Sequence, residues 1–342
     1  MEMHRYLLFF FLLSLTIAAA RGNATDPQPA FTSVRFPKVT LTNGMLQILV
    51  LLPDAAHGYY RGPRFDWSGM VAQATYHGHT FFGEWKTPHD SVGNDDVVGP
   101  ADEFGMGYLG ATGPLGYTEA KPGENFLKIG VGLQRKIEEA EYDFYHNYQI
   151  ITPGTWKIRH DRSWIEFHQE LSDGRGYGYS YMKKISLPRG RPEMVITHTL
   201  KNTGTKPINT SYYCHNFTRI DEEPLGPSYV VRFPFSVTTK SDIEHTAIQD
   251  YELHFPTVLK PDESIFLELS GSSQAVRDNT VTVENVTSHA GVKIQGDQPV
   301  QYFHFFGVSS AACPEPFLDI HLAPGEQTEW GSTYTFFETP TQ

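Results

Sequence analysis

The feature that most constrains the fold is a series of short segments in which apolar and polar residues alternate. Successive side chains of a β-strand point to opposite faces, so this alternation predicts strands with one buried face. Turn residues such as Pro153-Gly154 and Asn202-Thr203-Gly204 separate the segments. Closely spaced strands with such turns predict an all-β fold, a large antiparallel β-sandwich or a barrel. The segments are residues 125–134, 143–151, 156–160, 164–167, 193–200 and 208–217.

Helical patterns are weak, and the best is a short piece over residues 136–140. An architecture of alternating strands and helices is therefore not expected. No repeat, low-complexity tract or Pro/Ser-rich linker divides the chain, so residues 31–338 are expected to form one domain. Residues 339–342 are expected to be a loose tail.

Residues 85–117 show no clear periodicity and are rich in glycine. They include the acidic cluster Asp95, Asp96, Asp102 and Glu103. Long ordered loops in β proteins often carry function, so this segment is expected to be a functional loop. The alternative is a solvated insertion.

The 342-residue chain has a net charge of −12 at pH 7. Nucleic acid is therefore not an expected partner, because binding it needs a basic surface. The acidic balance also weighs against a polyanionic substrate, although a local basic patch could override it. A neutral sugar is compatible with this charge.

The N-terminus has the pattern of a secretory signal. An apolar run over residues 6–17 follows Arg5 and precedes three alanines at 18–20. The run is shorter than the roughly 20 residues that cross a bilayer. Residues 1–20 are therefore predicted to be a signal peptide, with an uncleaved anchor as the alternative. The mature protein is expected to be secreted or periplasmic, without a membrane association.

Common catalytic motifs are missing. The sequence has no Gly-x-Gly-x-x-Gly between a strand and a helix, no P-loop, no His-Glu-x-x-His and no Gly-x-Ser-x-Gly elbow. His77 and His79 flank Gly78 in a spacing that some metal sites use. A hairpin turn explains this pair without a metal, so no metal site is expected.

Residues 59–69 combine two arginines, an aspartate and several aromatic residues. Aromatic faces pack against the apolar faces of pyranose rings, and charged side chains bind the hydroxyls. Arg64 and Asp66 are therefore predicted to line a sugar groove. A structural salt bridge between these two residues is the alternative.

Two segments carry a family resemblance. Tyr212-Tyr213-Cys214-His215-Asn216-Phe217 ends a predicted strand, and Cys313-Pro314-Glu315-Pro316-Phe317-Leu318-Asp319-Ile320 precedes the turn Pro324-Gly325-Glu326. Both resemble segments of aldose 1-epimerases, the galactose mutarotase-like superfamily. The resemblance implies its large β-sandwich, the supersandwich, with His215 as general acid and Glu315 as general base.

The family also has a second histidine in an early loop, in a context that this sequence lacks. The early loop offers His89, Asp90, Asp102 and Glu103 instead. Of these, His89, Asp102 and Glu103 are predicted to bind substrate together with Asn216. Proton transfer between a carboxylate, an imidazole and a sugar opens the ring and interconverts the anomers. The resemblance therefore implies an isomerase acting on a small sugar, with no metal or organic cofactor.

Two other functions stay open at this point. One is a non-catalytic protein that binds a sugar or glycan. The other is a polysaccharide lyase or hydrolase on the same fold; a hydrolase would need a carboxylate pair such as Glu315 with Glu103 or Asp102.

The two cysteines, Cys214 and Cys313, lie close in sequence to the two proposed catalytic residues. Cys214 is adjacent to His215, so strand alternation turns it to the opposite face. We therefore expect two separate thiols, with a disulfide as the alternative in an exported protein.

Overall fold

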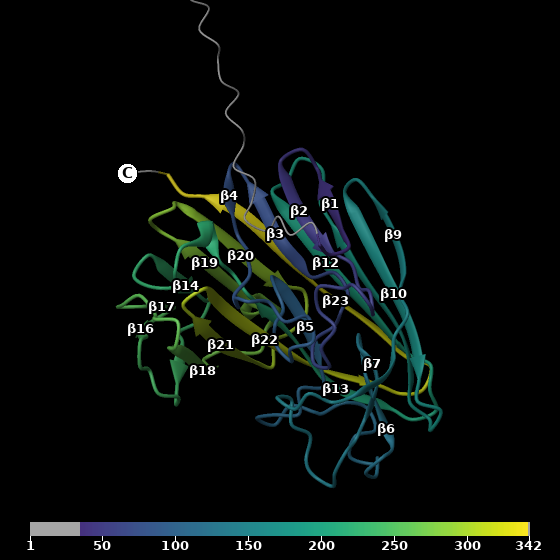
Figure 1. Cartoon of the computed structure of the whole chain (residues 1–342). Helices are drawn as coiled ribbons and strands as arrows, with labels where there is room; N and C mark the ends of the chain where they lie inside the picture. Colours follow the sequence, from purple (N-terminus) through teal and green to yellow (C-terminus); the bar gives the residue numbers. More distant parts are fainter. Residues whose placement is uncertain (1–34, 341–342) are drawn as a thin grey trace, which may run out of the picture.

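The computed structural model describes residues 35–340, and the predicted signal peptide lies outside these residues. Antiparallel strands make up four sheets, of ten, six, four and three strands (Figure 1). The described residues contain no α-helix, and their 3-10 helices are η1 (Ile220–Glu222) and η2 (Val276–Asp278). No helix within residues 35–340 is long and apolar enough to cross a membrane. The predicted all-β antiparallel fold is confirmed.

The two large sheets form the body of the molecule. The ten-stranded sheet has the order β16 (Ala247–Gln249), β17 (Glu252–His254), β14 (Tyr229–Arg232), β19 (Thr280–Asn285), β20 (Ala290–Gly296), β23 (Gln327–Glu338), β12 (Glu193–Asn202), β11 (Gly178–Ser186), β10 (Trp164–Ser172) and β9 (Lys157–Asp161). The six-stranded sheet has the order β15 (Thr238–Thr239), β18 (Ser264–Ser270), β21 (Tyr302–Val308), β22 (Ala311–Leu322), β13 (Ile208–Asn216) and β5 (Pro100–Phe104).

Two smaller sheets complete the fold. The N-terminal sheet has the order β1 (Lys38–Thr42), β2 (Leu46–Leu51), β3 (Val71–Tyr76) and β4 (His79–Thr80). The three-stranded sheet consists of β6 (Asn125–Lys128), β7 (Gly132–Arg135) and β8 (Ile150–Pro153), and β6 and β7 are labelled at the lower right in Figure 1.

The alternating strands bury one face each. Ile165 and Phe167 of β10 are fully buried, and their polar neighbours are only partly covered. β12 and β18 show the same alternation. The buried faces meet in a large core that includes Ile196, Val283 and Phe305. Burying apolar surface at about 25 cal/mol per Å² is the main stabilisation of such a core.

Strands β5 and β13 are different, because nearly all of their residues are buried. They pair side by side, with Cys214 opposite Asp102 and His215 opposite Ala101. Charged residues on these strands therefore lie inside the protein and need partners there.

The local predictions had mixed outcomes. Strands at residues 164–167, 193–200 and 208–217 are confirmed, as is the hairpin turn at His77-Gly78, where both residues have positive φ. Residues 125–134 are not one strand but the β6–β7 hairpin. Gly130 has φ +80° in its turn, and a Cβ there would lie 2.7 Å from the Asp66 side chain. Glycine is required here because it has no side chain.

Three further predictions are corrected. Residues 143–149 form turns, because the Asp143 carboxylate accepts a hydrogen bond from the Tyr145 backbone N–H and bends the chain. Residues 136–140 are not helical. Residues 85–117 are not one loop, because they contain the buried strand β5. With both faces covered, β5 lacks the alternation that reveals half-buried strands.

Candidate functional site

A cavity of about 310 Å³ opens beside the ends of β13 and β22. Aromatic rings dominate its wall, and Arg64, Asp95, His215 and Glu315 interrupt them. The lining residues are Arg64, Phe65, Trp85, Asp95, Met106, Tyr108, Phe144, Tyr145, His215, Phe217, Phe266, Phe306 and Glu315. Such a mainly apolar wall with a few placed polar groups is typical of a small-molecule site.

His215 and Glu315 are in direct contact on this wall. His215 Nε2 lies 2.9 Å from Glu315 Oε1, and only 8% and 4% of the two side chains are exposed. The last cross-strand pair of the ladder between β13 and β22 is Tyr213 with Phe317. Continuing that register by two residues on each strand places His215 opposite Glu315. Sheet register therefore brings together an imidazole and a carboxylate that are 100 positions apart in the sequence.

Aromatic rings hold the His215 imidazole in place. It stacks on Phe217 with centroids 3.9 Å apart and an interplanar angle of 3°. Phe306 meets it edge-on at 5.4 Å. Its Nδ1 is buried and has no hydrogen-bond partner among the described residues. With Nε2 in contact with Glu315 and the ring fixed by stacking, the imidazole and the carboxylate have a defined orientation on the cavity wall.

Arg64 lines the cavity, and its guanidinium is hydrogen-bonded to buried residues behind the cavity wall. Its Nε donates to Glu103 Oε2 at 2.7 Å, and its Nη2 donates to the Tyr213 hydroxyl at 2.8 Å. Lys128 Nζ donates to the other Glu103 oxygen at 2.9 Å. Burial alone would raise the pKa of Glu103, but Arg64 and Lys128 outweigh it and lower that pKa. Glu103 is therefore a buried anchor for Arg64 and does not reach the cavity wall.

Asp66 and Asp102 belong to a second buried network in the interior of the sandwich. Lys183 Nζ lies 2.6 Å from Asp102 Oδ2 and 3.7 Å from Asp66 Oδ2. The Tyr181 hydroxyl joins Asp66 to His198, and the Tyr212 hydroxyl binds Asp102. Neither carboxylate lines the cavity.

The expectation that Asp66, Asp102 and Glu103 contact a sugar is therefore corrected, because buried lysine and arginine side chains engage their carboxylates. The alternative of a salt bridge between Arg64 and Asp66 is not met either, since each pairs with a different residue.

His89 and Asn216 also lie away from the cavity wall. The ring nitrogens of His89 bind Asp96 Oδ1 at 2.8 Å and the Tyr59 carbonyl at 2.9 Å. Burial alone would lower the pKa of His89, but these two hydrogen bonds outweigh it and raise that pKa. The Asn216 amide donates to the Pro314 carbonyl and accepts from the Tyr334 hydroxyl. Both residues brace the backbone around the site.

Most residues of the cavity wall were not predicted from the sequence. Trp85, Phe217 and Phe306 form one aromatic group, with Trp85 stacked on Phe217 at 5.2 Å. Phe217 could have been found, because strand alternation from His215 turns it to the same face. Asp95 lies on the wall as well, and Lys86 Nζ is 2.5 Å from its Oδ1.

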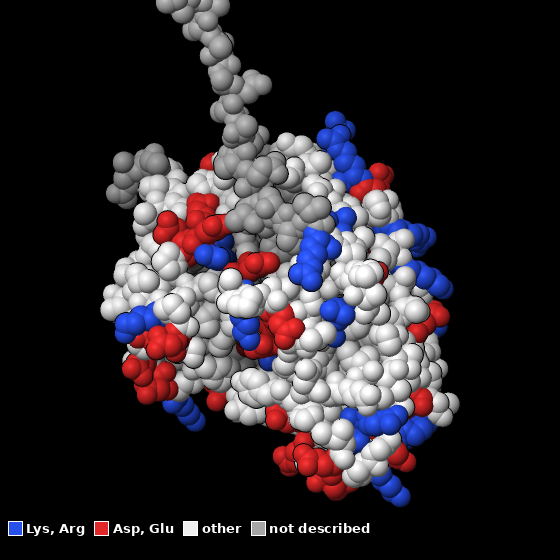
Figure 2. All heavy atoms as spheres, viewed as in Figure 1, with Lys and Arg blue, Asp and Glu red and all other residues white. Residues whose placement is uncertain are grey.

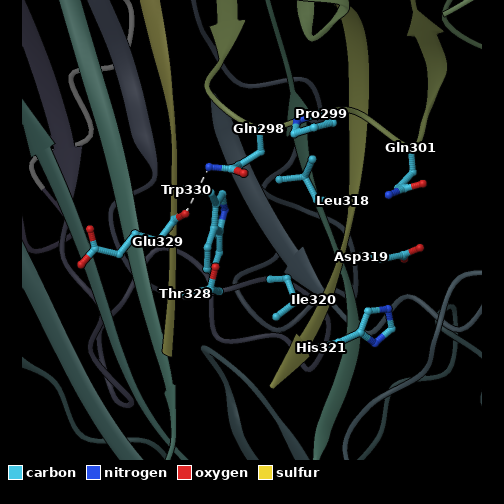
Figure 3. A pocket seen from close by; sticks show the side chains of 10 residues that line it. All are labelled: Gln298, Pro299, Gln301, Leu318, Asp319, Ile320, His321, Thr328, Glu329 and Trp330. Atoms are coloured by element: carbon cyan, nitrogen blue, oxygen red, sulfur yellow. Dashed lines mark hydrogen bonds between the residues drawn. The ribbon is translucent and has the colours of Figure 1, made fainter. Parts of the chain in front are cut away.

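A second hollow, of about 300 Å³, lies beside Trp330 (Figure 3). Leu318, Ile320 and Trp330 form its apolar side, and polar side chains such as Gln298 and Asp319 surround them. None of the ion pairs within residues 35–340 joins two side chains of this hollow. Of these two, the cavity at His215 and Glu315 is the one lined by an imidazole and a carboxylate in contact.

Metal-ligating side chains do not gather in the described part of the chain in a group of three or more. His77 pairs with Glu338, and His79 pairs with Asp221. Both cysteines are free and buried, so the expectation of two separate thiols is confirmed. The Cys214 thiol faces the other sheet, where it lies 3.5 Å from the Tyr334 hydroxyl.

No family model matches the sequence. No curated protein sequence matches it either. The fold, in contrast, matches many solved structures. A putative aldose 1-epimerase from Escherichia coli aligns over 89% of this chain and 99% of its own length, with 13% identity and a TM-score of 0.53.

Two further structures give the same result. A galactose mutarotase-like protein from Clostridium acetobutylicum aligns over 88% of this chain and 95% of its own length, with 14% identity and a TM-score of 0.55. A GalM/aldose epimerase homologue from C. elegans covers 89% and 100%, with 12% identity and a TM-score of 0.52. The chain therefore has the galactose mutarotase-like fold, and the predicted resemblance is confirmed at that level.

Proposed function

We propose that this protein is an aldose 1-epimerase-type isomerase that interconverts the anomers of a small sugar. The observation that carries the proposal is the contact between His215 Nε2 and Glu315 Oε1 on the wall of an aromatic cavity. An acid and a base held side by side at a cavity that takes a small molecule are what anomer exchange needs.

In the proposed reaction, Glu315 removes the proton from the anomeric hydroxyl while His215 protonates the ring oxygen. The bond between the anomeric carbon and the ring oxygen breaks, and the anomeric carbon becomes an aldehyde. Rotation about the neighbouring carbon–carbon bond presents the other face of the aldehyde. His215 then takes its proton back from the hydroxyl that attacks, and Glu315 returns its proton to the new anomeric oxygen. Protons and electrons balance without a further reactant.

The cavity wall supports a sugar as the ligand. Its volume of about 310 Å³ falls at the lower end of ordinary ligand sites and suits a small molecule. Trp85 and Phe217 offer ring faces, and the Trp85 Nε1 donor is buried without a partner in residues 35–340. Acidic and basic side chains are interspersed over the face in Figure 2, which suits a neutral ligand.

A non-catalytic sugar-binding protein is the second candidate, and the aromatic wall favours it equally. A hydrolase or lyase has less support. Asp102 and Glu103 are bound in the interior and cannot form the second carboxylate of a hydrolase pair. Arg64 is already paired with Glu103, so it is a poor clamp for a uronic acid carboxylate.

Anomer exchange of freshly dissolved α-glucose and α-galactose, followed by polarimetry or anomeric proton signals, tests the proposal. We expect acceleration by the wild type without added metal or nucleotide. Glu315→Gln is expected to lose roughly 10²–10⁴-fold in rate, which is typical of removing a general base. Glu329→Gln, an exposed change on β23, is the matched control. Binding without acceleration would support the non-catalytic candidate instead.

We also propose that the protein is exported, on the basis of the signal-like residues 1–20. N-terminal sequencing of the mature protein tests this directly. A mature chain that still starts at Met1 would contradict it.

A further inference from the structure

Glu315 has an imidazole on each side of its carboxylate. His215 Nε2 lies 2.9 Å from Oε1, and His304 Nδ1 lies 3.9 Å from Oε2. The second histidine comes from β21, on the opposite side of β22 from β13. The two oxygens of the proposed base are therefore distinguished by different neighbours.

His304 is enclosed by protein. Only 2% of the residue is exposed, and its Nδ1 has no hydrogen-bond partner among the described residues. Phe266, Tyr302 and Phe317 surround its ring, with centroids 5.2, 5.1 and 4.6 Å away. A buried polar atom without a partner is costly, and Glu315 Oε2 is a hydrogen-bond acceptor 3.9 Å away.

Sheet register fixes this arrangement. His304 pairs across the strands with Glu315 on one side and with Glu268 on the other. Glu268, His304, Glu315 and His215 therefore form a row across neighbouring strands, with acids and imidazoles alternating. The charged groups that bear on the pKa of His304 are Glu315 and Glu268.

The lowered pKa of His304 favours the neutral imidazole, which can donate one hydrogen bond. Burial lowers the pKa of His304, and the opposing effects of Glu315 and Glu268 do not restore it. A neutral imidazole with its proton on Nδ1 would present an N–H to Glu315. A distance of 3.9 Å is too long for a hydrogen bond, and a side-chain shift of about 1 Å closes it.

We infer that His304 is a positioning residue for Glu315: its Nδ1–H binds Oε2, keeps the carboxylate ionised and turns Oε1 toward His215 and the cavity. The catalytic part of this inference rests on the proposed function. The contact between the two side chains does not, because it can be measured without any turnover.

Long-range proton–nitrogen NMR of the histidine rings tests the contact. The His304 signal is assigned by its loss in His304→Gln. We expect the Nδ1-protonated tautomer in the wild type. In Glu315→Gln, we expect a changed Nδ1 shift and a protonation midpoint at lower pH, because the negative charge beside the imidazole is gone. A proton on Nε2, with a titration that is the same in Glu315→Gln, would overturn the inference.

Kinetics test the consequence for catalysis. His304→Phe removes the donor and is expected to lower kcat about 10- to 100-fold, with a smaller change in KM. The acidic limb of its pH–rate profile should move to higher pH, because one of the two imidazoles that favour the ionised carboxylate is then lost. His304→Gln keeps an N–H donor and should recover part of the rate. His321→Gln, at an exposed position of β22, is the control.

Equal losses in His304→Phe and His304→Gln, with an unmoved pH profile, would contradict the positioning role. If the wild type shows no anomer exchange, the proposed function fails. The NMR result on Glu315→Gln then still decides whether His304 binds Glu315. If His304→Phe does not fold, the two glutamine variants carry the comparison.

Discussion

Arg64 and Asp66 are separated only by Phe65, yet their side chains enter two different buried networks. Arg64 binds Glu103 and Tyr213 behind the cavity. Asp66 faces the interior of the sandwich, where Tyr181 and Ser68 donate to it and Lys183 lies 3.7 Å away. The segment with these two residues therefore connects the cavity wall to the interior of the sandwich. Each of the two networks contributes separately to the stability of the fold.

Replacing Arg64 with methionine is expected to destabilise the protein strongly. Glu103 would keep only Lys128 and Tyr213, and removing one partner of a buried ion pair typically costs about 3–5 kcal/mol. Urea denaturation measures the loss in free energy of unfolding. Arg159→Met is the control, because the Arg159–Glu166 pair is at the surface and such pairs contribute about 1 kcal/mol or less. Equal losses in both variants would contradict the structural role of Arg64.

Trp85 is expected to contribute to ligand binding more than to folding. Its ring stacks on Phe217 at the cavity wall, and the residue is only partly buried. Trp85→Ala should weaken sugar affinity about tenfold, which corresponds to about 1.4 kcal/mol of lost contact. Isothermal titration calorimetry measures the Kd. Trp164→Ala, on β10 and outside the cavity lining, should leave the Kd unchanged. A Trp85→Ala protein with wild-type affinity would remove the aromatic wall from the binding site.

The thiols are expected to be inert in the folded protein. Burial raises the pKa of both Cys214 and Cys313, so little reactive thiolate is present at neutral pH. An alkylating reagent should leave the native protein unmodified and add two groups after denaturation without a reductant. Intact mass measures both states. A mass deficit of two protons with no alkylation would reveal a disulfide and contradict the separate thiols.

The fold and the central pair could be predicted because local patterns encode them. Alternation and the turn at residues 202–204 predicted β12 and β13, and short motifs pointed to His215 and Glu315. Strand β5 was missed because its charges are balanced by Lys183, Arg64 and Lys128, which are distant in the sequence. A charged, fully buried strand has no alternation to detect.

The position of His304 opposite Glu315 could have been predicted from the turn between β21 and β22. Strands β21 and β22 are joined by only Ser309 and Ser310, and a two-residue hairpin turn determines which residues pair. Counting back from Val308 and forward from Ala311 sets His304 opposite Glu315. His198 offered no such signal, because its partners Tyr181, Tyr212 and Asp102 come from separate strands and two sheets.

His198 is expected to make the protein sensitive to mild acid. It is buried between Tyr181 and Tyr212, which bind its two ring nitrogens at 3.0 and 3.2 Å. Burial lowers its pKa from 6.5 to about 4, with Lys183 adding to this and Asp102 opposing it. In the unfolded chain His198 takes up a proton near pH 6.5, and in the folded protein only near pH 4. Stability is therefore lost as the pH falls through this window.

The size of the effect follows from the two pKa values. Between pH 7 and pH 5 the mismatch removes about 2 kcal/mol of the free energy of unfolding. The titration of Asp66 changes the free energy of unfolding in the opposite direction. Burial raises its pKa to about 6, so as the pH falls the folded state takes up this proton before the unfolded state does. The contribution of His198 must therefore be isolated by a variant. His198→Gln keeps polar groups beside Tyr181 and Tyr212 but cannot titrate.

Urea denaturation at pH 7 and pH 5 makes the comparison. The wild type should lose about 2 kcal/mol more than His198→Gln over this range. His160→Gln, at an exposed position of β9, should behave like the wild type. If His198→Gln loses as much stability as the wild type, the buried imidazole is not the acid-sensitive group. A neutral His198 leaves Lys183 as the cation in contact with Asp102, 2.6 Å from its Oδ2.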